Sequence, residues 1–172
     1  MTHQLQRLLH TTTNPVADYQ TGPQRQLLAP AVHTGVAPIK TLASGIVRMP
    51  GFHHALPHMH ARSEITIFVA HGLVASLVGD ELEHLFIHSP HSIMTIGAGV
   101  PHVGVNLSAE VATVFEARTD PAFNEDVERV PRLDTLAVAR VAQAQNDFRN
   151  GAFKERLQSA SWSSAVWTVD DN

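Results

Sequence analysis

The middle of the chain alternates between short apolar runs and turn-forming residues. Runs of β-branched and aromatic residues are separated by Gly and Pro between about positions 42 and 118. Runs of this kind are typical of strands, and the breaks between them are typical of turns. Strands are expected at 42–49, 64–70, 73–78, 83–87, 92–96, 102–107 and 111–118. Because no helical pattern alternates with them, the rhythm predicts an all-β sandwich or barrel.

The N-terminal segment, residues 1–39, has a different pattern. It is polar and is interrupted by Asn14-Pro15 and Gly22-Pro23. We expect a short helical turn near residues 4–10 and then an extended arm. Apolar positions between 26 and 40 predict short edge strands, because Pro is tolerated at sheet edges and not in central strands. The barrel itself is expected over residues 40–118.

Residues 119–172 are expected to form a C-terminal helical extension. Leu133 to Arg149 is rich in Ala, Val and Gln and lacks Gly and Pro, which predicts a helix. Asp134 could cap its start, and Asn150-Gly151 should end it. Residues 152–160 can form a second short helix. Both tryptophans lie in 162–169, where we expect them to pack against the barrel or a partner subunit.

Composition limits the possible functions. Of 172 residues, 44% are hydrophobic and 16% are charged, which indicates a folded domain with a real core. The net charge is −4, and residues 63–117 contain no Lys or Arg, so nucleic acid is an unexpected partner. There is no cysteine for a disulfide or a thiolate metal site. No apolar run is long enough to cross a membrane and no secretory signal is present, so a cytoplasmic location is expected.

Histidine is the unusual residue. Nine of the 12 histidines lie between His53 and His102, and each one alone is ordinarily a solvated or hydrogen-bonded side chain. The pattern H-x-H places His58 and His60 on one face of a strand. Glu64 has the same parity, although residues 61–63 could bend the chain, and His102 follows a Gly-Pro turn. Three imidazoles and one carboxylate that converge would hold a divalent metal.

These residues resemble the two motifs of a small, single-domain cupin. Gly51, His58, His60, Glu64 and Gly72 resemble the first motif, with one extra residue before the first His and before the last Gly. Gly97, Gly99, His102 and Asn106 resemble the second, although Gly97 stands where Pro is usual and His91 where a leading Gly is usual. The resemblance covers about residues 40–118. It implies a double-stranded β-helix, or jelly roll, often as a homodimer. It also implies one divalent transition metal (Fe, Ni, Cu, Mn or Zn) on His58, His60, Glu64 and His102.

Neighbouring residues suggest roles in catalysis and substrate binding. Glu64 could act as a base as well as a ligand, and His53 or His54 could be a general base, the alternative being solvent exposure. Arg48 and Arg62 could bind an anionic group or simply form salt bridges. Phe52 and Phe115 are expected in the lining or the core, where they would contact an apolar substrate.

The family resemblance favours dioxygenase-type chemistry on a small aromatic or enolisable oxygenated molecule. A metal-dependent cyclase, isomerase or lyase, such as a polyketide cyclase, is the second reading. A non-catalytic protein that binds a small molecule is the third.

Overall fold

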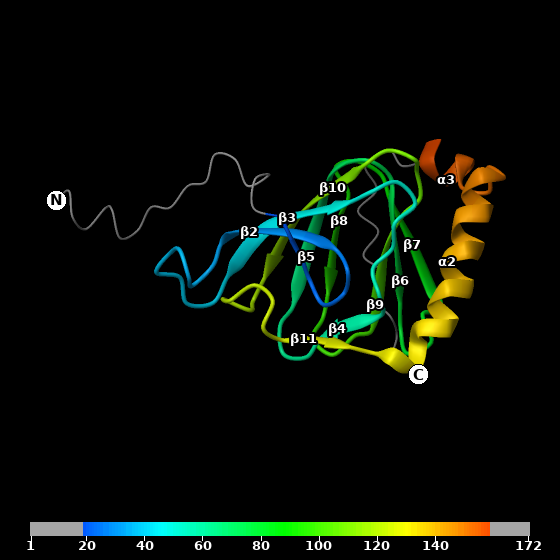
Figure 1. The fold of residues 1–172 in the computed structure, drawn as a ribbon. Coiled ribbons are helices and arrows are strands. Elements are labelled where there is room, and N and C mark those ends of the chain that lie inside the picture. The colour runs from blue at the N-terminus through cyan, green and yellow to red at the C-terminus, as the bar shows by residue number, and fades with distance from the viewer. Residues whose placement is uncertain (1–18, 159–172) are drawn as a thin grey trace.

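Two antiparallel sheets face each other in the computed structural model, which describes residues 19–158 (Figure 1). The first sheet has the order β1 (Gln20–Thr21), β2 (Leu27–Val32), β3 (Ala43–Met49), β10 (Ala112–Arg118), β5 (Ile65–His71) and β8 (Ile93–Ile96). The second has the order β11 (Val127–Arg129), β4 (His58–His60), β9 (His102–Asn106), β6 (Val74–Val78) and β7 (His84–His88). This two-sheet arrangement is the one expected for a jelly roll.

Strict alternation decides what points into the barrel. In β3, Ala43, Gly45, Val47 and Met49 are buried, and the residues between them are less buried. In β10, Ala112, Val114, Glu116 and Arg118 are buried. Because successive side chains of a strand point to opposite faces, two charged residues continue the apolar inner face of β10. The same alternation places Phe115 on the outer face, where it is 40% exposed.

The core has two parts. One lies between the sheets and contains Val47 and Met49 of β3, Val114 of β10 and Val74 of β6. The other lies between the second sheet and helix α2 (Asp134–Arg149), which covers the outer face of that sheet (Figure 1). Burial of these apolar side chains is the main force holding the layers together, at about 25 cal/mol per Å² of apolar surface removed from water.

The C-terminal elements match the expected helices, with one difference at the start. A 3₁₀ turn, η2 (Pro131–Leu133), precedes α2, and α3 (Lys154–Gln158) follows it. Asp134 makes no capping hydrogen bond and instead pairs with Arg129 at 2.7 Å, so the cap expected there is wrong. Asn150 caps the end of α2, and Gly151 follows with a φ of 79°, a left-handed conformation that suits Gly.

Both flanks of residues 40–118 contribute strands to the sheets. β2 lies in the segment where short edge strands were expected and pairs with β3, and β11, which was not expected, pairs with β4. The turn expected at residues 4–10 and both tryptophans lie outside the described residues. Within residues 19–158, no helix is both long and apolar enough to span a bilayer.

Candidate metal centre

Three histidines meet inside the barrel. His58, His60 and His102 are each at most 4% exposed, and one ring nitrogen from each lies within 4.8 Å of the others. The ring centroids of His58 and His102 are 4.3 Å apart, and that of His60 lies 5.6 and 5.5 Å from them. The expectation that these three side chains converge is therefore confirmed.

Local sequence and one turn produce this convergence. Alternation along β4 turns His58 and His60 inward, while Met59 packs on the core under α2. His102 begins β9 and lies directly opposite His58 in the ladder. The turn before His102 contains Gly99 at a φ of 75°, and the Gly99 N–H donates to the carbonyl of His60 at 2.7 Å. Glycine permits that backbone conformation, and the hydrogen bond ties the turn to β4.

Backbone carbonyls orient two of the imidazoles. His58 Nδ1 lies 2.8 Å from the Leu56 oxygen, and His102 Nδ1 lies 2.9 Å from the Val100 oxygen. Since a carbonyl only accepts, each Nδ1 must carry the proton and donate it. Each Nε2 is then unprotonated and free to bind a metal, which is the usual arrangement for a histidine ligand.

A carboxylate faces the third imidazole. His60 Nδ1 lies 3.5 Å from Asp126 Oδ1, and both side chains are almost completely buried. Neither His60 nitrogen has a hydrogen-bond partner within residues 19–158, and His60 Nε2 is fully enclosed. A buried polar nitrogen without a partner costs free energy unless something binds it. The missing partner and the two neighbouring imidazoles fit a metal ion.

The charge state of the cluster suits a metal. Burial lowers the pKa of His102 to about 4, and burial together with neighbouring His102 lowers the pKa of His58 well below its ordinary value. Burial, followed by the charge of Arg118, also lowers the pKa of His60. All three imidazoles are therefore neutral near pH 7, as metal binding requires. Neutral imidazole ligands suit Zn, Cu, Fe and Ni.

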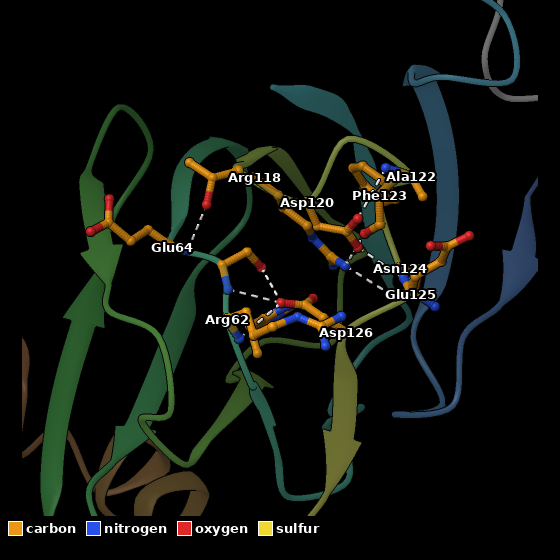
Figure 2. A network of polar contacts seen from close by, with 12 residues as sticks. Arg62, Glu64, Arg118, Asp120, Ala122, Phe123, Asn124, Glu125 and Asp126 are labelled. Carbon is orange, nitrogen blue, oxygen red and sulfur yellow. Dashed lines mark hydrogen bonds and ion pairs between the residues drawn. The ribbon is translucent and has the colours of Figure 1, made fainter. Parts of the chain in front are cut away.

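Glu64 does not join the histidines, which corrects the four-ligand set expected from its spacing. Its side chain is exposed, and its backbone N–H donates to Thr119 Oγ1 at 2.9 Å. Figure 2 shows the carboxylate pointing away from Asp126. Residues 61–63 form a bend between β4 and β5, so strand parity does not continue from His60. Ser63 and Ile65 are buried instead, and Ile65 lines the cavity beside the histidines.

A small cavity opens beside the histidines, between the two sheets. His58 and His102 contribute to its wall, with about 40 Å³ of space for the centres of water-sized molecules. That is room for only a few water molecules. Most of the lining is apolar and comes from Val47, Met49, Ile65, Ile67, Val74, Ile96 and Val114. The polar exceptions besides the histidines are Gln26, Ser76 and Glu116.

Glu116 is the carboxylate that does line the cavity. It is 4% exposed and receives a hydrogen bond from Arg118 Nη2 at 2.9 Å. Burial acts to raise the pKa of Glu116, but the charge and hydrogen bond of Arg118 outweigh it, so the pKa lies below its usual value. Glu116 is therefore an ionised carboxylate near pH 7, in the cavity wall to which His58 and His102 also contribute.

The other expected catalytic residues lie away from the cavity. His53 Nε2 is 2.8 Å from the Arg25 carbonyl, and His54 Nδ1 is 2.9 Å from the Ala55 carbonyl. Both histidines are half-buried. Neither lines the cavity in the part of the chain that the structure describes.

The four expected substrate contacts are also on outer surfaces. Arg48 alternates outward from β3, with its guanidinium 5.6 Å from the Tyr19 ring centre, and Arg62 is exposed. Phe52 is 40% exposed and lies under Arg149, and Phe115 is on the outer face of β10. The structure therefore does not support substrate contact by these residues, because none of the four lines the cavity beside the histidines.

Sequence reasoning missed four polar groups of the site. Glu116 could have been found, because it shares parity with Ala112 and Val114 on an otherwise apolar face. Ser76 and Gln26 carry no comparable signal. Asp126 lies in a charged stretch that reads as a loop, and only the pairing of β11 with β4 brings it to His60.

Comparison with known proteins gives a fold. No family model matches the sequence, and no curated protein matches it. The cupin domain of Schizosaccharomyces pombe Cnp3 is similar at 14% identity and a TM-score of 0.52, over 63% of this chain and 72% of that one. A Klebsiella pneumoniae protein with a double-stranded β-helix domain is similar at 12% identity and a TM-score of 0.55, over 69% of this chain and 96% of that one. The chain has the cupin fold.

Oxalate decarboxylase of Lactobacillus farciminis shares this cupin fold over a smaller part of its length. The identity is 15% and the TM-score is 0.56, over 67% of this chain and 34% of that one. Neighbours at such low identity establish the double-stranded β-helix and leave the reaction open, since one fold supports many functions. The function has to be argued from the three histidines and the cavity.

Proposed function

We propose that this cupin is an enzyme that holds one divalent transition metal on His58, His60 and His102 and acts on a small oxygenated molecule. One observation carries the proposal: three buried, neutral imidazoles converge beside a cavity whose wall also contains an ionised carboxylate, Glu116. When bound, the metal supplies Lewis-acid polarisation of a substrate oxygen and, if it is a redox metal, reactivity with dioxygen.

The substrate class follows from the donor set and the cavity. The three histidine ligands carry no charge, so the ion can bind an anionic or enolisable oxygen of the substrate directly. The cavity wall offers Gln26 and Ser76 as polar contacts and is otherwise largely apolar. Its small size favours a compact molecule. The structural neighbour named oxalate decarboxylase supports this class, because its named substrate is also small and oxygenated.

Glu116 is the residue we assign to proton transfer. It is ionised because Arg118 stabilises the charged form, and it lies in the wall of the cavity. In this position it can accept a proton from a hydroxyl group, or from a carbon next to a carbonyl group, of a substrate in the cavity. The apolar lining around it keeps water away from the resulting anion.

Proton removal is common to the two reaction types that we consider. Dioxygenase-type chemistry is our first candidate, because an apolar cavity and a deprotonated, electron-rich substrate suit attack by dioxygen. Isomerase, cyclase or lyase chemistry is the second, and the observation that favours it is Glu116 itself, since proton transfer alone completes an isomerisation.

The experiment begins with the metal content of the purified full-length chain. Protein with one equivalent of metal is mixed with acetylacetone, catechol and pyruvate, and oxygen uptake and solvent deuterium exchange are followed in parallel. Oxygen uptake that requires metal supports the dioxygenase, and deuterium exchange without oxygen uptake supports the isomerase or lyase. Failure to bind metal after addition of Fe, Ni, Cu, Mn or Zn would overturn the proposal.

A further inference from the structure

The three imidazoles are held in two different ways. His58 and His102 each direct Nδ1 at a backbone carbonyl within their own chain segment, two residues earlier. His60 has no such carbonyl partner among the described residues, and its Nδ1 faces the carboxylate of Asp126, 66 positions later in the sequence, at 3.5 Å. His60 is therefore the one histidine of the cluster whose orientation depends on a charged side chain.

Asp126 is itself firmly held. Its Oδ2 atom accepts hydrogen bonds from Ser63 Oγ at 2.6 Å, from the Ser63 N–H at 2.8 Å and from the Arg62 N–H at 3.2 Å (Figure 2). The backbone is fixed as well, because the Ala61 N–H donates to the Asp126 carbonyl at 3.0 Å and Val127 pairs with His60. The position of the carboxylate is thus set before any metal binds.

The second carboxylate oxygen of Asp126, Oδ1, faces the imidazole of His60. Asp126 Oδ1 is buried and has no hydrogen-bond partner within residues 19–158, and neither has the facing His60 Nδ1. The three hydrogen bonds from Ser63 and Arg62 all fall on Oδ2, which leaves Oδ1 as an acceptor that faces the imidazole. Asp126 Oδ1 is an acceptor and lies 3.5 Å from His60 Nδ1. The two atoms are complementary if His60 Nδ1 carries a proton and donates it.

We propose that Asp126 is the positioning residue for His60. Its Oδ1 atom accepts the Nδ1–H of the imidazole and so selects the tautomer whose Nε2 is free for a metal ion. A carboxylate behind a histidine ligand also raises the basicity of the ligand. The proposal rests on the metal site of the proposed function and is independent of the reaction, so the two can fail separately.

The key variant is Asp126→Asn, which has nearly the same shape. Its amide oxygen can still accept from Ser63 and Arg62, and its NH₂ group then faces His60. An NH₂ group is a donor, so His60 Nδ1 must become the acceptor and the proton must move to Nε2. The matched control is Ser63→Ala, which removes the 2.6 Å hydroxyl contact on the far side of the carboxylate and leaves Oδ1 in place.

Two readouts are made on the full-length chain. Nitrogen-15 NMR of the histidine rings, before zinc is added, should show the Nδ1–H tautomer of His60 in the wild type and in Ser63→Ala, and the Nε2–H tautomer in Asp126→Asn. Competition with a chelator should show a loss of zinc affinity of about 10- to 100-fold in Asp126→Asn. The Ser63→Ala chain should remain close to the wild type.

Each contrary result has a distinct meaning. The inference is wrong if the wild type shows the Nε2–H tautomer of His60, a result that needs no variant to fold. It is also wrong if Ser63→Ala loses as much affinity as Asp126→Asn, because Asp126 would then act only by holding the bend at residues 61–63. A wild-type chain that binds no zinc or other divalent metal would overturn the proposed function, while the NMR result would still decide the contact.

Discussion

Glu116 and Arg118 form an ion pair inside the barrel, with 2.9 Å between Arg118 Nη2 and Glu116 Oε2. The residues are two positions apart on β10, so both side chains occupy its inner face. Arg118 also donates to the Phe123 carbonyl and to Asn124 Oδ1, and its guanidinium lies 4.3 Å from the centre of the Phe123 ring. The carboxylate of the cavity is thus connected to the segment that follows the barrel.

Breaking this pair should destabilise the protein strongly. Arg118→Met leaves the buried Glu116 carboxylate without a counter-charge, and we expect the free energy of unfolding to fall by about 3–5 kcal/mol. Replacing both partners, as Glu116→Gln with Arg118→Met, should cost less than the sum of the single changes. Urea denaturation of the three variants measures this coupling. Strictly additive losses would show that the two side chains do not stabilise each other.

Glu116→Gln should separate catalysis from metal binding. Glu116 is not part of the histidine group, so metal content should remain near that of the wild type. Turnover or deuterium exchange should fall by about 10²- to 10⁴-fold, because Gln cannot accept the proton. Metal analysis and rate measurements are made on the same preparation after circular dichroism has confirmed the fold. Unchanged rates would remove Glu116 from the proton-transfer role.

Histidine and glutamate substitutions should behave differently at the metal centre. His58→Ala and His102→Ala each remove one of three ligands, and both should abolish stoichiometric metal binding. Glu64→Gln should bind metal as the wild type does, because the Glu64 side chain is exposed and is not part of the histidine group. Elemental analysis of the four proteins checks this. Metal loss in Glu64→Gln would restore Glu64 to the ligand set.

His88 should make stability depend on pH. It is 6% exposed, its Nε2 lies 3.0 Å from Ser76 Oγ, and burial lowers its pKa to about 4 from the ordinary 6.5. Between these values the unfolded chain binds a proton that the folded chain does not. Stability is therefore complete above pH 6.5 and falls by about 3 kcal/mol as the pH drops to 4.

Paired variants isolate the contribution of His88 to this pH dependence. His88→Gln keeps a polar partner for Ser76 but cannot titrate, so its unfolding free energy should decline less steeply between pH 6.5 and 4. His91→Gln, at an exposed position, should follow the wild type. Urea denaturation across this range, with chelator present in every sample, makes the comparison. Equal slopes in all three proteins would mean that His88 titrates normally in the fold.

The strands and two of the metal ligands follow from local sequence. Apolar alternation predicted seven strands that the structure contains within a residue or so at each end. The pair His58 and His60 needed only the two-residue period of a strand. The strands and the pair His58 and His60 use rules that act over a few residues, so the sequence alone could support them. His102 was added from the resemblance to the second cupin motif, and its place opposite His58 depends on the pairing of β9 with β4, between residues 44 positions apart.

Tertiary structure decided the rest of the site. The two-residue period of a strand wrongly placed Glu64 on the same face as His58 and His60. The bend at residues 61–63 changes which side chains face inward, and no local rule gives the shape of that bend. The position of Asp126 against His60 depends on the pairing of β11 with β4, a contact between residues more than 60 positions apart. The burial of the Glu116–Arg118 pair depends on the segment after β10, because Arg118 is also held by the Phe123 carbonyl and by Asn124. Local periodicity fixes the face on which a side chain lies, whereas long-range strand pairing determines what that face meets.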